Sequence, residues 1–321
     1  MFQHRIRKRN WKLVMFVVMF VSLLAACSNA QSGQGSKQEG TDSDKIKVVT
    51  TIAQIAEPLS VIGGERLQVS SLMGPGVDPH LYNASQGDLN KLQDADVIFY
   101  NGLYLEGNMV EIFAEISKNK PVLALGETID EELLLLDEEG AIDPHIWFDI
   151  DLWRMALEQA VEKLKEMSPD DAELFETQKQ SYFSKLEELK IDAEKLGTIP
   201  DERRVLVTAH DAFGYFGRMH DMEVVGLQGL STEDEIGLSD IQSTIELLVE
   251  RQIPAVFVES TISEKSIRSV IEGAAEAGQD VKLGGELFSD AMGEAGTEEG
   301  TYIGMYRHNV DTIYKALAEE E

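Results

Sequence analysis

The feature that most constrains the fold is a repeated alternation of short β-branched runs with helical stretches. Four runs precede residue 150 and four follow residue 200: 46–52, 67–73, 96–101 and 121–125, then 204–210, 223–229, 255–260 and 281–285. Continuous apolar runs separated by helices are typical of buried parallel strands. The pattern predicts an α/β fold of two lobes, 46–167 and 201–321, each a small parallel β-sheet flanked by helices.

Residues 168–200, between the two lobes, predict one long helix. Ser168 suits an N-cap, and Pro169 suits the first helical position. Apolar residues then recur near helical spacing, at Phe175, Tyr182, Leu186, Leu189, Ala193 and Leu196. A helix of about 27 residues would be about 40 Å long. We therefore expect a rigid connection across both lobes rather than a soft hinge.

The N-terminus has the pattern of an export signal. Residues 1–12 carry five Lys or Arg side chains and no acid, and residues 13–26 form an apolar run. This run is shorter than the roughly 20 residues of a spanning helix. It ends in Leu24-Ala25-Ala26-Cys27, which resembles the bacterial lipobox. We expect a signal peptide over 1–26, a lipid on Cys27, a flexible tether over 27–45, and a chain anchored on the outer face of the cytoplasmic membrane.

Cysteine count and charge exclude several classes of function. Cys27 is the only cysteine, so the chain forms no internal disulfide, no cysteine-based zinc site and no thiol nucleophile. The 58 acidic residues against 28 basic ones give a net charge of −30. Such a chain is a poor partner for nucleic acid and other phosphate-rich ligands, and in a general way it favours cations.

Two histidines stand in the same rigid frame, Asp-Pro-His, at His80 and His145. Proline fixes its own φ and restricts the residue before it, so each imidazole is held with little backbone freedom. Asp78 and Asp143 could orient these loops from behind the imidazoles, although an ordinary turn role explains them equally well. The frame suits a metal ligand because its order is set during folding.

Two further candidates come from the second lobe. His210 ends a predicted strand, and Asp290 follows the last predicted strand of that lobe. Carboxyl ends of parallel strands face the crevice where α/β proteins bind ligands. With the two Asp-Pro-His residues they would give three imidazoles and one carboxylate, a complete ligand set for a transition-metal ion. Taken singly, each could instead be a hydrogen-bonded structural residue or a loop acid. His220 and His308 are expected to be structural.

An ordered set of motifs then identifies a family. The chain resembles the substrate-binding lipoproteins of metal-ion ABC transporters, the ZnuA/TroA/PsaA-like group, and is most similar to its manganese-binding members. The resemblance extends from the lipobox through SLMGPGVDPHLYNAS, DPHIWFDI, TAHDAFGYFG and VFVESTISEKSI to GGELFSDAMGEAG. It implies His80, His145, His210 and Asp290 as metal ligands and a supporting role for Glu259. It also implies two lobes joined by a long helix, and a monomer that serves an ABC permease and its ATPase.

The composition of one loop and the type of ligands bear on the identity of the metal, and the number of ligands bears on the class of function. Residues 126–143 are acidic but lack the histidines often found in zinc-specific relatives, whereas a His3Asp set suits tetrahedral zinc. The likeness to the manganese members favours Mn²⁺, with a zinc-specific receptor as the alternative. Four protein ligands without an HExxH helix indicate capture rather than catalysis. A secreted metallohydrolase and an adhesin-type surface lipoprotein are the alternatives from other classes.

Overall fold

A computed structural model describes residues 45–233 and 235–318. The predicted signal peptide, Cys27 and all but the last residue of the tether lie outside the described residues. All eight strand predictions are confirmed to within two residues at either end. Their bounds are β1 (Ile46–Thr50), β2 (Leu67–Ser71), β3 (Val97–Tyr100), β4 (Val122–Ala124), β5 (Val205–His210), β6 (Glu223–Gln228), β7 (Ala255–Glu259) and β8 (Lys282–Leu287).

The first half of the described chain is one four-stranded parallel sheet in the order β2-β1-β3-β4. In its register, Val48 of β1 stands opposite Val69 and Val97 on the two neighbouring strands. These valines are wholly or largely buried, because helices cover the sheet on both faces. The connecting helices are α2 (Ala53–Gly63), α3 (Gln86–Asp94) and α4 (Val110–Ile116).

The strands of the second half do not form one continuous sheet. Its strands form two parallel ladders, β5-β6 and β7-β8, and the register of β7-β8 shifts between Val256 and Phe257. The two ladders are in contact through β5 and β7. At the end of β5, the amide of His210 donates to the Glu259 carboxylate (2.9 Å) rather than to a strand carbonyl. The helices here are α7 (Gly214–His220), α8 (Leu238–Arg251) and α9 (Lys265–Glu276).

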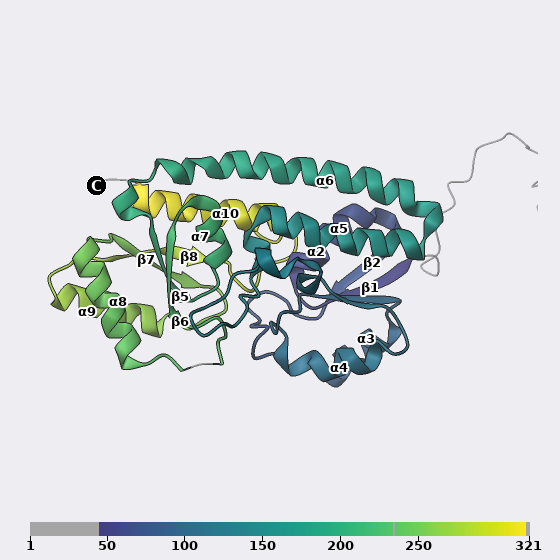
Figure 1. The fold of residues 1–321 in the computed structure, drawn as a ribbon, viewed down its shortest axis with the longest axis horizontal. Helices are drawn as coiled ribbons and strands as arrows, with labels where there is room; N and C mark the ends of the chain where they lie inside the picture. The colour runs from purple at the N-terminus through teal and green to yellow at the C-terminus, as the bar shows by residue number, and fades with distance from the viewer. Residues whose placement is uncertain (1–44, 234, 319–321) are drawn as a thin grey trace, which may run out of the picture. The chain divides into compact units, whose positions relative to one another are not determined.

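The predicted long helix is present as α6 (Ala172–Ala193), extended by the 3-10 turns η7 (Pro169–Asp171) and η8 (Glu194–Thr198). The Ser168 hydroxyl does not cap the helix; it donates to the Asp171 carboxylate (2.6 Å). Figure 1 shows α6 running alongside α5 (Ile150–Met167) and α10 (Tyr302–Ala318). It contacts α2 and α5 from the first half and α10 from the second. One helix thus packs on both halves.

The core of this helical layer is apolar with one buried cation. Phe175, Leu186 and Leu189 of α6 are fully buried against the core. Lys179 is also buried, and its ammonium pairs with Glu158 (2.7 Å) and Glu176 (3.0 Å). A buried charge is tolerated only when it is paired in this way. The pairing joins α5 to α6, so it reinforces the rigid packing of the long helix.

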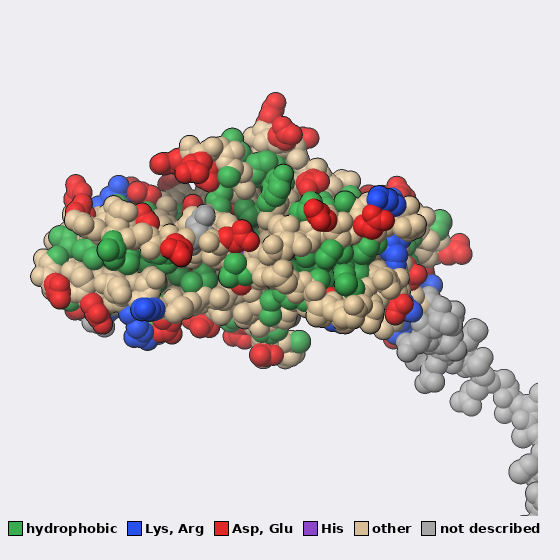
Figure 2. Space-filling model, turned by 90° about the horizontal axis from the view of Figure 1, so that it is seen from below, with side chains coloured by type: hydrophobic (Ala, Val, Ile, Leu, Met, Phe, Trp, Pro, Cys, Tyr) green, Lys and Arg blue, Asp and Glu red, His purple; other side chains and the backbone are tan. Residues whose placement is uncertain are grey.

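Short 3-10 turns fill the loops between these elements: η2 (Gly64–Arg66), η3 (Gly107–Met109), η4 (Gly126–Thr128), η5 (Glu131–Leu133), η6 (Ile146–Phe148) and η9 (Asp201–Arg203). Across the described residues, no helix is both long and apolar enough to span a bilayer. Figure 2 shows Asp and Glu side chains scattered over the visible face, with far fewer Lys and Arg. No described histidine is visible on that face.

Candidate metal centre

The structure brings together all four residues predicted as ligands. His80 lies in the loop after β2, His145 precedes η6, His210 ends β5, and Asp290 follows β8. One potential ligand atom from each lies within 4.8 Å of the other three. All four side chains are buried: His80 is 4% exposed, Asp290 1%, and the other two are fully enclosed. Residues from both halves therefore meet at one enclosed point.

Asp290 stands at the centre of the three imidazoles. Its oxygens lie 3.7 Å from Nε2 of His80, 3.3 Å from Nε2 of His145 and 3.4 Å from Nε2 of His210. None of these five buried atoms has a hydrogen-bond partner. Ligands about 2.0 Å from a tetrahedral ion are about 3.3 Å apart. Buried polar atoms are normally paired, so the donor set and its spacing fit an ion.

Two of the imidazoles are fixed from behind by carboxylates. Asp143 Oδ1 accepts from both the ring Nδ1 (2.7 Å) and the amide (2.9 Å) of His145. Glu259 forms a close ion pair with Nδ1 of His210 (2.6 Å) and accepts from its amide. A carboxylate on Nδ1 orients the ring and leaves Nε2 for a metal. The structure thus places Glu259 and Asp143 in the supporting positions considered from the sequence.

His80 is held through its main chain. Its amide donates to Asp78 Oδ1 (2.9 Å), and its carbonyl accepts from Asn108 Nδ2 (3.3 Å). The second oxygen of Asp78 accepts from the hydroxyl of Thr232 (2.6 Å), which lies between β6 and α8. The Asp-Pro-His loop of the first half is therefore tied directly to a loop of the second half.

The loop that carries Asp290 is positioned by residues that the sequence did not reveal. The carbonyl of Ser289 accepts from Gln54 Nε2 (3.1 Å) and Trp147 Nε1 (3.2 Å). Asn309 of α10 bonds both the amide (3.0 Å) and the carbonyl (2.7 Å) of Phe288. No motif marks Gln54 or Asn309, because their partners are main-chain atoms far away in sequence. Trp147 lies within the motif DPHIWFDI, two positions after His145.

Electrostatics set different proton affinities within the cluster. Burial opposes charge on His145 and His210, but the neighbouring carboxylates outweigh it; they raise the pKa of His145 to about 9 and that of His210 well above its usual value. For His80 burial dominates, and its pKa falls to about 4. Burial likewise opposes charge on Asp290, yet the imidazoles hold its pKa well below the usual range. Without metal, the carboxylates therefore favour the protonated forms of His145 and His210, whereas burial favours the neutral form of His80.

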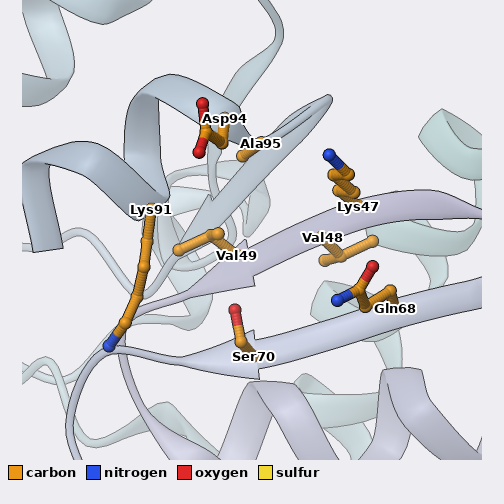
Figure 3. A pocket seen from close by; sticks show the side chains of 8 residues that line it. All are labelled: Lys47, Val48, Val49, Gln68, Ser70, Lys91, Asp94 and Ala95. Atoms are coloured by element: carbon orange, nitrogen blue, oxygen red, sulfur yellow. The ribbon is translucent and has the colours of Figure 1, made fainter. Parts of the chain in front are cut away.

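The other two described histidines lie outside this cluster, as expected. His220 Nε2 bonds the hydroxyl of Tyr306 (2.8 Å), and His308 Nε2 lies 3.0 Å from the carbonyl of Glu286. A separate cavity of about 210 Å³ lies beside β1, β2 and α3 (Figure 3). Its two lysines, Lys47 and Lys91, extend in opposite directions and do not converge on a point. Of the groups found in the described chain, only the His3Asp cluster has metal-ligand spacing.

Comparison with known proteins agrees with the fold and with a metal-binding role. The manganese-binding lipoprotein MntA of Bacillus subtilis is 47% identical over 307 residues, covering 95% of this chain and 98% of that protein. The zinc-binding protein TroA of Treponema pallidum is 46% identical over 287 residues, covering 88% and 92%. The solved structure of the same TroA superposes with a TM-score of 0.84, at 46% identity, over 86% of this chain and 100% of that one. The chain is a substrate-binding protein of a metal ABC transporter.

The family model described as "Zinc-uptake complex component A periplasmic" (ZnuA) matches residues 48–316. The chain belongs to this family. The resemblance and the α/β class inferred from the sequence are thereby confirmed. The prediction that the chain is not an enzyme is also confirmed, because members of the family are metal-binding receptors.

Proposed function

We propose that His80, His145, His210 and Asp290 bind one divalent transition-metal ion as the cargo of the transporter. The observation that carries the proposal is the convergence of five buried, unpartnered atoms, three imidazole nitrogens and two carboxylate oxygens. Leaving buried polar atoms unpaired costs about 1–3 kcal/mol each. An ion in this position would satisfy all of them at once.

Manganese is the favoured cargo and zinc the next. The likeness to MntA supports manganese, and the stretch 126–143 has no histidine-rich loop. The His3Asp set and the likeness to TroA support zinc, which binds most such sites more tightly than manganese does. A zinc-specific uptake receptor is therefore the second candidate, favoured by the ligand set itself.

In this proposal, the remaining parts of the chain anchor the protein and hold the ion for delivery. In this proposal residues 1–26 are a lipoprotein signal, Cys27 carries the lipid, and residues 27–45 are the tether. Lobes 46–167 and 201–321, joined by the helix over 168–200, hold the ion between them. The protein works as a monomer on the outer face of the cytoplasmic membrane, delivering the ion to an ABC permease driven by its ATPase. Support comes from the lipobox and from the lipoprotein names of relatives.

Replacing a ligand tests the site. The variants His80→Ala and His145→Ala should each lose most of the rise in melting temperature that Mn²⁺ or Zn²⁺ gives the parent, because a ligand stabilises only the state it binds. The measurement is thermal unfolding with and without each ion. His308→Ala is the matched control and should respond like the parent, since His308 lies outside the cluster.

A metal-dependent shift unchanged in both variants would remove these residues from the site. The choice between ions needs a second measurement. Protein purified from its own host should contain manganese by elemental analysis, followed by a Mn²⁺/Zn²⁺ competition. Zinc as the only ion in host-purified protein would establish the zinc-specific alternative.

A further inference from the structure

The two histidine loops of the first half are fastened very unequally to the second half. Around His145, the hydroxyl of Tyr215 donates to the carbonyl of Asp143 (3.1 Å). Trp147 donates to Ser289, and the hydroxyl of Tyr302 donates to the carbonyl of Trp147 (2.7 Å). These bonds are buried, so this side of the centre is fixed.

On the His80 side there is a single cross-connection. Of the hydrogen bonds recorded between described residues, only Thr232 to Asp78 joins the loop 72–85 to the second half. The ring of His80 also approaches Asp290, at 3.7 Å the longest of the three imidazole–carboxylate distances. Because this partly buried bond is the only recorded hydrogen bond that would have to break there, the loop of His80 is the less firmly held wall of the centre.

The hydrogen bond between Thr232 and Asp78 completes a series of contacts that leads from His210 to His80. Gln228 stands opposite His210 in the β5-β6 ladder, and its side-chain amide donates to the carbonyl of Thr232 (2.8 Å). Thr232 then donates to Asp78, and Asp78 accepts from the amide of His80. A ligand of the second half is thus linked to a ligand of the first half through Thr232.

We propose that the hydroxyl of Thr232 is a latch that holds the His80 loop closed over the bound ion and thereby slows its release. Thr232 is a positioning residue: it acts on His80 through Asp78 and does not itself contact the ion. This inference rests on the proposed function, since it concerns the release of the same cargo.

The test compares metal dissociation from the full chain, purified in detergent, and from two variants of Thr232. The variant Thr232→Val keeps the shape but removes the donor, whereas Thr232→Ser keeps the donor. With Mn²⁺ or Zn²⁺ loaded and excess chelator added in a stopped-flow experiment, we expect release about tenfold faster from Thr232→Val, the effect of losing one hydrogen bond to a carboxylate. Thr232→Ser should release at a rate within about twofold of the parent, and the association rate should be unchanged in both.

A distant threonine supplies the control. The hydroxyl of Thr198 also makes one hydrogen bond, to the carbonyl of Lys195 (2.7 Å), and Thr198→Val should leave release unchanged. In an Asp78→Ala background, Thr232→Val should add nothing, because the partner is already gone. Parental release rates in Thr232→Val, or equally fast release from Thr232→Ser, would overturn the latch while leaving the metal site intact. A parent that takes up neither ion would overturn the proposed function and the latch together.

Discussion

Each imidazole of the cluster meets a different environment, although all three present Nε2 to one carboxylate. His145 and His210 have acidic partners on Nδ1, whereas His80 is fixed through its amide and carbonyl. The acidic partners favour the charged imidazolium, and burial favours the neutral ring. The metal-free centre is therefore a mixed site, in which the carboxylates raise the pKa of two rings and burial lowers the pKa of the third.

Metal binding should release protons, and the metal-free protein should lose stability as pH rises from 6.5 to about 9. The folded-state pKa of His145, about 9, lies above the ordinary value near 6.5. Its contribution to the free energy of unfolding is thus complete below pH 6.5 and is lost as pH passes through about 9. The lowered pKa of His80 acts only below pH 6.5, so His80 does not contribute to the change within this window.

Chemical unfolding in the presence of chelator, at both ends of that window, measures the stability change. Calorimetry of metal binding in buffers of different ionisation enthalpy counts the protons released. Affinity for the ion should rise over the same window, because the metal displaces the proton from Nε2. Binding without proton release near neutral pH would show that His145 and His210 are already neutral in the metal-free protein.

At the scale of single residues, the sequence predicts the four clustered residues better than the residues that position them. Asp-Pro-His appears as a local frame, and His210 is marked by its place at the end of a strand. Thr232, Gln54 and Asn309 carry no such mark, because each bonds a group more than 20 residues away. Long-range pairing of this kind depends on the folded positions of two segments and has no local pattern.

Among the secondary-structure elements, α10 braces the Asp-Pro-His loop of His145. Tyr302 and Tyr306 are fully buried, and their hydroxyls donate to the carbonyls of Trp147 (2.7 Å) and Phe148 (3.1 Å) in η6. The amide of Tyr302 in turn donates to Glu57 of α2, which also accepts from Tyr182 of α6. Helices α2 and α6 thus meet the first turn of α10 at Glu57, so the position of η6 is set by the helical layer.

Tyr302→Phe should lower the free energy of unfolding by about 1–3 kcal/mol, because it leaves the buried carbonyl of Trp147 without a partner. It should also weaken metal binding, since Trp147 holds the Asp290 loop through Ser289. Denaturant unfolding and metal titration measure the two effects.

Tyr314→Phe on the same helix is the matched control. The ring of Tyr314, which faces the ammonium of Lys195 at 5.7 Å, survives that change. Equal stability for the two variants would mean that the Tyr302 hydroxyl does not brace the loop.

The elements themselves were largely predictable, and their pairing was only partly so. Runs of β-branched residues such as 204–210 predict strands, because a parallel strand that is buried on both faces consists almost entirely of apolar residues. The split of the second half into two ladders was not predicted. The second half also contains a register shift between Val256 and Phe257 and a hydrogen bond from the amide of His210 to the side chain of Glu259. Neither has a signature in composition or periodicity.

For the molecule as a whole, the net charge concerns how cations approach the protein surface. A chain with a net charge of −30 attracts cations to its surface in general. On the face that Figure 2 shows, these acids are dispersed rather than gathered in one patch. Under the proposed function, selective capture is the task of the buried cluster.

Cys27→Ser should release the protein from the membrane fraction into the medium or the soluble fraction, because lipid attachment requires the thiol. Fractionation of host cells followed by immunoblotting measures this. Metal binding should stay at the parental level, since none of the four clustered residues lies near the N-terminus in sequence. A variant still found wholly with the membrane would show that another segment anchors the chain.

The near-complete enclosure of the cluster has a consequence for how an ion is chosen. Side chains that are at most 4% exposed do not exchange an ion freely with the surroundings; exchange waits for the protein to open. If opening is slower than the encounters between ions and protein, the centre keeps the ion that it closes on first. Occupancy then follows the supply of each metal outside the cell and the rate of closure over it, rather than the order of equilibrium affinities. A receptor of this kind can carry the more weakly binding metal wherever that metal is the more abundant.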